Sequence, residues 1–369
     1  MGTAPQDLLN IYWLGRQIAW RYKLDTYDNE VLKRIQASLA TARREIQLKF
    51  EAQLLRTDWS ASRAEEVLYA LDELTQGVRL TMADQLGEAA GFAGQHSLAE
   101  HSDILSVGGA AVNVSFVSLS AEQIRQMFVD TPLGGKTLSA WVDAAFDTTV
   151  KDGIKEELNV GMLQGEGYPK LVKRLSQGFD MLSKEQATTL ARTYVQSANV
   201  AAMEAVYKQN ADVVKRVKWR ATLEPGYKNT GHGTCLRCAA LDGKEWALDD
   251  TSRPDCPLHA RCRCVTTPET NSWRDLGIDI DELEDAARPY TMRPDKSIGV
   301  GGAREIEEYG FHQGDYGSWF EKQSDSFKLN AVGPGRLELM ESGKVKFGDL
   351  VDSKGNLLTL EELKRVYGN

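Results

Sequence analysis

All five cysteines of this 369-residue chain fall between Cys235 and Cys264. The first two stand in the sequence Cys235-Leu-Arg-Cys238, a spacing that places both thiolates on one tight turn. Two thiolates held in this way can reach one zinc ion at about 2.3 Å. Clustering of all the cysteines in one short segment therefore predicts a metal site in a reducing compartment, not a disulfide framework.

The second half of this candidate site reads Cys256-Pro-Leu-His259-Ala-Arg-Cys262-Arg-Cys264. It offers an imidazole and three more thiols, which is more than a tetrahedral zinc ion needs. Cys256 is expected to stay outside the site. If this segment is extended, Cys262 and Cys264 point to opposite sides, so both remain candidates for the fourth position. The expected metal ligands are Cys235, Cys238, His259 and either Cys262 or Cys264.

We expect the zinc to be structural. A hydrolytic zinc keeps an open position for water and usually has a carboxylate base nearby. In zinc deaminases a Glu stands two residues after the ligating His, and Arg261 occupies that position here. A closed, sulfur-rich site would instead stabilise a small β element with strands near residues 217–221 and 244–247, so no catalytic residue is expected.

The elements around this site are mostly helical. Apolar residues recur every three or four positions in residues 28–54 and 62–82, which predicts two amphipathic helices that pack together. Ser62 and Glu65 form a capping box at the start of the second helix. Residues 94–120, rich in Ser and Gly, break this pattern and include a short strand near residues 112–116. Further helices are predicted over residues 141–163, 168–179, 184–208 and 359–366, the last capped by Thr359 and Glu362.

Charge and composition exclude several classes of protein. The net charge of −9 argues against a protein that coats nucleic acid by bulk charge. Residues 271–369 hold 13 basic and 19 acidic side chains, so most of this charge lies in the tail, where residues 290–302 are predicted to be a loop. Neither an export signal nor a membrane span is expected. Asp130 stands where a phosphate-binding loop needs glycine, so the sequence before Thr137 is not expected to bind phosphate.

Basic side chains leave nucleic-acid contact open. They lie on the predicted strand and on the helices before it, where either phosphate contact or a solvated surface explains them. These residues are Lys170, Lys173, Arg174, Lys215, Arg216, Lys218 and Arg220.

The order of these motifs resembles the phage Mu F-like head-morphogenesis proteins, also called minor head proteins. The resemblance runs from about Leu133 to Pro268. It rests on Ala191-Arg-Thr193, Ala198-Asn199, Trp219, Cys235-x-x-Cys238, Leu241-Asp-Gly243-Lys244 and His259-x-x-Cys262-Arg-Cys264. A weaker likeness continues in Trp319-Phe320, Gln323, Gly333-Pro-Gly-Arg336, Gly343, Phe347 and Thr359-Leu360.

The resemblance implies a non-enzymatic component of the procapsid or virion near the portal vertex, assembled in the host cytoplasm. It implies the portal protein and the major capsid or scaffolding protein as partners, packaged DNA as a further candidate partner, no membrane, and no cofactor beyond zinc. The expected fold is mainly α with a small zinc-stabilised β element (α+β), in an elongated helical protein of several modules. The expected parts are an N-terminal helical region for portal or capsid contact (1–93), a connector (94–132), the Mu F-like module with the zinc knuckle (133–268) and an acidic C-terminal region (269–369).

Two alternatives remain at this stage. A metal-dependent nuclease would use His259 with Asp242 or Asp249. A zinc-knuckle DNA-binding protein would instead contact phosphates through Arg237, Arg261 and Arg263.

Overall fold

A computed structural model describes six longer segments of the chain and several short pieces. The segments are residues 61–112, 138–144, 168–224, 233–270, 287–292 and 308–367, and the short pieces lie within residues 16–48 and 152–166. The chain divides into two compact units. We call them the helical unit (Trp20–Ser97 and Leu119–Ala202) and the sheet unit (Met1–Ala19, Leu98–Ser118 and Met203–Asn369). Among the described residues, no helix is both long enough and apolar enough to cross a membrane.

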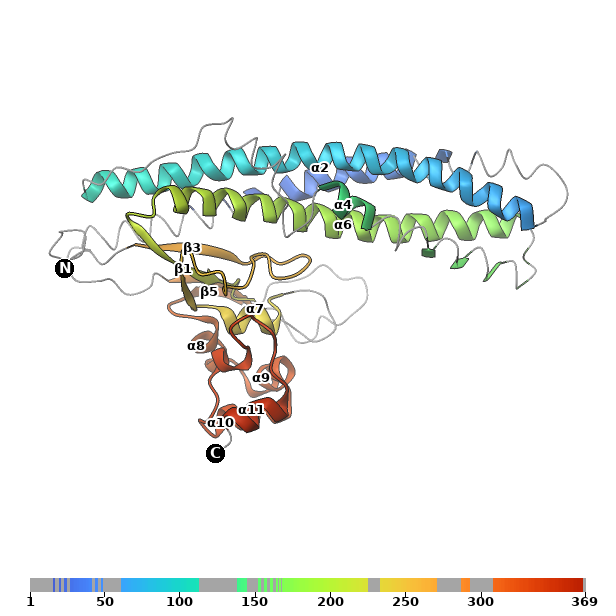
Figure 1. The fold of residues 1–369 in the computed structure, drawn as a ribbon. Coiled ribbons are helices and arrows are strands. Elements are labelled where there is room, and N and C mark those ends of the chain that lie inside the picture. Colours follow the sequence, from blue (N-terminus) through green and yellow to red (C-terminus); the bar gives the residue numbers. More distant parts are fainter. Residues whose placement is uncertain are drawn as a thin grey trace. The chain divides into compact units, whose positions relative to one another are not determined.

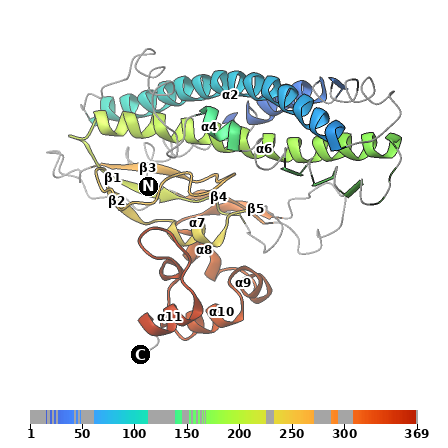
Figure 2. The same cartoon turned by 45° about the vertical axis from the view of Figure 1, so that its right-hand side comes forward.

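Long helices build the helical unit. Most of α2 (Ala61–Val112) and most of α6 (Tyr168–Gln209) belong to this unit, and the two helices lie side by side (Figures 1 and 2). Residues 27–41 form another helix, and α4 (Leu138–Asp143) is short. Ile35 of the first helix and Met82 of α2 belong to one buried core, so the expected packing of these two helices is confirmed.

The break expected in the helix from residue 94 onward is wrong, because α2 continues to Val112. Ala89, Ala93 and Ser97, four residues apart, are all buried on one face of α2. Burial of that face offsets the helix cost of glycine, which is about 1 kcal/mol per residue relative to alanine. Of the strand expected at residues 112–116, the structure describes only Val112, which is helical. Asp130 also lies outside the described residues.

α6 also differs from its prediction. The sequence predicts separate helices over residues 168–179 and 184–208, whereas one helix spans both. The residues between them are Asp-Met-Leu-Ser, which contain neither proline nor glycine to end a helix. Of the helix expected at residues 141–163, the structure describes the end of α4 and short helical pieces between residues 152 and 161. The side chains of Ser62 and Glu65 lie outside the described residues.

A three-stranded antiparallel sheet forms the first part of the sheet unit. Its strands are β1 (Val214–Arg220), β2 (Glu245–Ala247) and β3 (Val265–Thr270), in the order β2-β1-β3. Val217 of β1 pairs with Trp246 on one side and with Pro268 on the other. Val217 and Trp219 are buried while Lys218 is half-buried, so the period-two pattern correctly predicted this strand.

The acidic C-terminal region supplies the second part of the sheet unit. Its two strands, β4 (Arg288–Met292) and β5 (Glu308–His312), pair antiparallel. Short helices follow: α8 (Tyr316–Glu321), α9 (Asp325–Val332), α10 (Pro334–Glu341), the 3-10 helix η2 (Phe347–Leu350) and α11 (Leu360–Tyr367). The loop expected at residues 290–302 is wrong for its first three residues, which complete β4, because they form the ladder with β5.

One hydrophobic core joins both parts of the sheet unit. It contains Trp219 from β1, Leu241 before β2, and Trp319, Phe347 and Leu363 from the C-terminal region. The C-terminal helices and α7 (Leu236–Leu241) are neighbours in both views (Figures 1 and 2). The described chain is therefore mostly helical with a small antiparallel sheet, as the sequence predicts.

Candidate metal centre

The first two cysteines stand at the start of α7, the helix that we call the knuckle helix. Cys235 is its N-cap, with extended backbone angles (φ −71°, ψ 156°). Its sulfur accepts a hydrogen bond from the backbone N–H of Cys238 at 3.4 Å. Cap and helix position thus place both sulfurs on the same turn, in the arrangement predicted from the Cys-x-x-Cys spacing.

A second turn brings His259 to these sulfurs. The Nε2 atom of His259 lies 3.1 Å from the Cys235 sulfur and 3.3 Å from the Cys238 sulfur. Its Nδ1 atom lies 2.8 Å from the carbonyl oxygen of Ala260 and donates to it. Metal-binding histidines commonly use this arrangement, because the backbone carbonyl fixes the ring and leaves the other nitrogen for the ion.

The last two cysteines lie on the buried side of the knuckle. The Cys262 sulfur is 3.7 Å from that of Cys238, and the N–H of Cys262 donates to the carbonyl of His259 at 3.0 Å. Between them, Arg261 has φ 61°, a left-handed conformation that few residues other than glycine adopt. Cys238, Cys262 and Cys264 are all buried. The turn at Arg261 thus brings Cys262 back toward the knuckle helix.

The five predicted residues form two overlapping sets of donor atoms. Within each set, all donor atoms lie within 4.8 Å of one another, and Cys238 belongs to both. The first set is Cys235, Cys238 and His259, and the second is Cys238, Cys262 and Cys264. The thiol of Cys256 instead donates to the carbonyl of Cys264 at 3.1 Å. That Cys256 is not a ligand stays a prediction.

The sulfur–sulfur spacing fits a zinc ion, and the sulfur–nitrogen spacings are about 0.3 to 0.5 Å shorter than a tetrahedral site gives. A tetrahedral zinc ion places two sulfur ligands about 3.8 Å apart, and a sulfur and a nitrogen ligand about 3.6 Å apart. The Cys238 and Cys262 sulfurs are separated by 3.7 Å, and the His259 nitrogen lies 3.1 to 3.3 Å from its two sulfur neighbours. The soft thiolates and the imidazole are also ligands that zinc prefers.

The cluster holds thiolate charge even before a metal is considered. A hydrogen bond from Cys238, with a second from His259, lowers the pKa of Cys235 to about 4. The pKa of His259 rises to about 9, chiefly through its hydrogen bond to Cys235. Hydrogen bonds to neighbouring thiolates and burial raise the pKa of Cys238. The cluster therefore combines ionised sulfurs with groups that retain protons, and a divalent cation can replace those protons.

Asp242, a candidate catalytic group in the nuclease alternative, has a different role in the structure. Its fully buried carboxylate accepts hydrogen bonds from the backbone N–H groups of Ala221 and Tyr316, both at 2.7 Å. The guanidinium of Arg288 donates to both carboxylate oxygens, at 3.1 and 2.6 Å. Arg288 was not predicted as part of this site, because a partner 46 residues away in sequence leaves no periodic signal.

Acidic neighbours balance the basic strand. Lys218 lies 2.9 Å from Glu245 on β2 and 3.3 Å from Glu269 on β3, and Arg216 and Arg220 pair with the same two carboxylates. The arginines of the DNA-binding alternative are also engaged within the chain. Arg237 donates to the carbonyl of Gly355 at 2.7 Å, and Arg263 pairs with Glu224. These contacts favour a structural role for the basic side chains named here.

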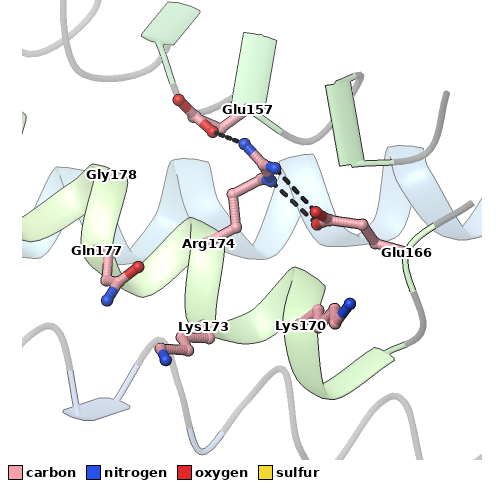
Figure 3. Close-up of a pocket in the computed structure, with 7 residues that line it drawn as sticks. All are labelled: Glu157, Glu166, Lys170, Lys173, Arg174, Gln177 and Gly178. Atoms are coloured by element: carbon pink, nitrogen blue, oxygen red, sulfur yellow. Dashed lines mark hydrogen bonds and ion pairs between the residues drawn. The ribbon is translucent and has the colours of Figure 1, made fainter. Parts of the chain in front are cut away.

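A separate pocket of about 460 Å³ lies at the start of α6 in the helical unit (Figure 3). Arg174 projects between two carboxylates, 2.9 Å from Glu157 and 2.8 Å from Glu166. Hydrogen bonds to these two groups raise the pKa of Arg174. Lys170 and Lys173 line the same pocket, which is therefore of mixed charge.

Comparison with known proteins supports the resemblance seen in the sequence. Residues 152–267 match the family model described as phage Mu protein F like protein. Comparisons with curated proteins and with solved structures found no match. The matched segment contains all five candidate ligands, β1, β2 and the first three residues of β3, and it ends before β4. The expected family resemblance is thus confirmed for this segment, and it suggests a phage head-morphogenesis protein.

Proposed function

We propose that this chain is a structural minor head protein of a phage, incorporated near the portal vertex during assembly in the host cytoplasm. The observation that carries the proposal is the match of residues 152–267 to the phage Mu protein F-like family. The proposed partners are the portal protein and the major capsid or scaffolding protein, with packaged DNA as a further candidate. In this proposal the helical region before residue 94 contacts the portal or capsid.

The proposed role of the metal centre is to fasten the knuckle helix to the turn that carries His259. Cys235, Cys238 and His259 would hold one zinc ion, with Cys262 as the fourth ligand because its sulfur lies 3.7 Å from that of Cys238. A zinc ion bound by four protein side chains supplies folding free energy and has no open position for substrate. This supports a structural function over hydrolysis.

Co-purification with the portal protein of the same phage tests the proposal directly. The tagged full-length chain and the portal protein are expressed together, and the chain is also sought by mass spectrometry in purified virions. We expect both association with the portal protein and presence in the virion in fewer copies than the major capsid protein. Absence from virions together with no binding to the portal protein would refute the proposal.

A nuclease assay separates the enzymatic alternative from this proposal. Asp242 is occupied by Arg288 and by two backbone amides, which removes it as an available base. We therefore expect no DNA cleavage with added Mg²⁺, Mn²⁺ or Zn²⁺. Cleavage that disappears in His259→Ala while the circular dichroism spectrum is unchanged would favour the nuclease.

A further inference from the structure

The C-terminal region contacts each chain segment that carries a candidate metal ligand. We call its described part, residues 287–292 and 308–367, the C-terminal clamp. All of it lies beyond the segment that matches the family model, which ends at residue 267. Its buried side chains nevertheless belong to the same core as Cys238, Cys262 and Cys264. The surroundings of the candidate metal centre are therefore completed by residues outside the matched segment.

Arg288 makes the central contact of this clamp. Its side chain is 7% exposed, and its guanidinium forms the bidentate pair with Asp242, the C-cap of the knuckle helix. The same guanidinium donates to the carbonyls of Ala221, at the end of β1, and Gly314, before α8. One buried side chain thus ties the end of the knuckle helix to β1 and to the clamp.

A second contact lies at the other end of the knuckle helix. Arg237, next to Cys238 in sequence, donates to the carbonyl of Gly355. Gly355 has φ 74°, and a Cβ atom there would lie 2.9 Å from the Leu241 side chain and 3.5 Å from that of Leu258. Leu241 belongs to the knuckle helix, and Leu258 precedes His259. The close approach of Gly355 therefore involves both halves of the candidate metal centre.

A third, indirect contact links the clamp to the segment that carries the two buried cysteines. Arg263 stands between Cys262 and Cys264 in the sequence, and its guanidinium pairs with the Glu224 carboxylate at 3.1 and 2.5 Å. The backbone carbonyl of Glu224 in turn accepts a hydrogen bond from the Tyr316 hydroxyl of the clamp at 3.1 Å.

We propose that Arg288 is a positioning residue of the metal centre, acting through Asp242, and that zinc binding is coupled to docking of the C-terminal clamp. This inference rests on the zinc site proposed above. Because Asp242 also accepts from the Tyr316 N–H, the knuckle helix and the clamp share one carboxylate. Coupling of this kind is reciprocal: the clamp strengthens zinc binding, and zinc strengthens docking of the clamp by the same factor.

Zinc affinity of the full-length chain tests the first direction. Arg288→Met keeps the apolar stem and removes the guanidinium, whereas Arg288→Lys keeps the charge without the two-pronged fork. The matched control is Arg336→Met, which removes a clamp arginine whose described hydrogen bond goes to the carbonyl of Leu358 and not to Asp242. Competition with a chromophoric chelator should show zinc binding weakened about tenfold or more in Arg288→Met, and within about twofold of wild type in Arg336→Met.

Hydrogen exchange tests the reverse direction in the wild-type chain. Removing zinc should accelerate exchange at the N–H of Tyr316 as well as in the knuckle helix. Equal zinc affinity in the Arg288 and Arg336 variants, or unchanged exchange at Tyr316 on zinc removal, would overturn the coupling. If Arg288→Met fails to fold, Arg288→Lys decides, with weaker zinc binding than in Arg336→Met expected. Failure of the wild-type chain to bind zinc would instead refute the proposed metal site itself, so the two failures are distinguishable.

Discussion

Replacing Asp242 by Asn should strongly destabilise the sheet unit. The carboxylate is fully buried, and Arg288 beside it is 7% exposed, so neither charge is solvated by water. Asn keeps the shape of the side chain but removes the charge and turns one acceptor into a donor. That donor would then face the N–H groups of Tyr316 or Arg288, both of which also donate. Removing one partner of a buried ion pair costs about 3–5 kcal/mol, because the other charge stays buried.

Chemical and thermal unfolding of the full-length chain measure this cost. In a domain of 150–250 residues, each kcal/mol lowers the melting temperature by about 2–4 °C, so Asp242→Asn should lower it by about 6–20 °C. Trp219 and Trp319 are both buried in the core of this unit, so its unfolding contributes to the change in tryptophan fluorescence. The matched control is Asp249→Asn, which makes the same change of charge at an exposed position and should stay within about 0.5 kcal/mol of wild type.

A double-mutant cycle distinguishes the ion pair from general damage to the core. Asp242→Asn combined with Arg288→Met removes both charges. Arg288→Met should therefore lower the free energy of unfolding less in the Asp242→Asn variant than in the wild-type chain. We expect a coupling energy of about 1–3 kcal/mol, as for residues in direct contact. The reasoning is refuted if the free energy of unfolding of Asp242→Asn lies within 1 kcal/mol of the wild-type value. It is also refuted if the effects of the two substitutions on that free energy are additive.

Three further changes test other parts of the structure. Cys238→Ser should abolish zinc binding because this sulfur belongs to both donor sets. Cys256→Ser should retain about one zinc per chain by elemental analysis. Equal zinc content in the two variants would contradict the assignment. Glu362→Gln tests the cap of α11. Hydrogen bonds from the N–H and the hydroxyl of Thr359 lower the pKa of Glu362, so its stabilising effect is present above the unfolded pKa and is lost as the pH falls through the folded value. The stability difference between wild type and this variant should therefore shrink below about pH 4, and a pH-independent difference would count against the cap. Gly355→Ala should lower the melting temperature and weaken zinc binding, because φ is 74° there and the added methyl group would lie 2.9 Å from a leucine of the knuckle helix. An unchanged melting temperature together with unchanged zinc affinity would show that the close contact at Gly355 is unimportant.

The sequence predicted which residues gather at the candidate metal centre. It did not predict how they divide into two overlapping sets of donor atoms. Spacing alone identifies Cys235, Cys238 and His259, because two short turns suffice to bring them together. The choice between Cys262 and Cys264 depends on the backbone between them and His259. That backbone turns at Arg261 with φ 61°, a conformation for which arginine carries no sequence signal.

Local patterns were reliable for elements whose stability is local. The alternation around Trp219 predicted β1, and the cap of Thr359 and Glu362 predicted α11, where the N–H of Thr359 donates to the Glu362 carboxylate at 2.8 Å. The pattern failed where tertiary burial outweighs propensity, as in α2 beyond residue 94. It also could not show that Glu245 and Glu269 face the basic side chains of β1, because cross-strand partners are distant in sequence.

The size of the sheet gives a reason for a cluster that could hold a metal ion and a clamp to occur together. β2 has only three residues, and a sheet this small buries too little apolar surface to be stable alone. Small domains compensate with a metal ion or with additional packed elements. The sheet unit offers both: a thiolate and imidazole cluster at one end of the knuckle helix, and the Arg288 pair with Asp242 at the other. Each fixes an end of the same short helix. Loss of the Arg288 pair should therefore weaken metal binding, and loss of the metal should weaken docking of the clamp.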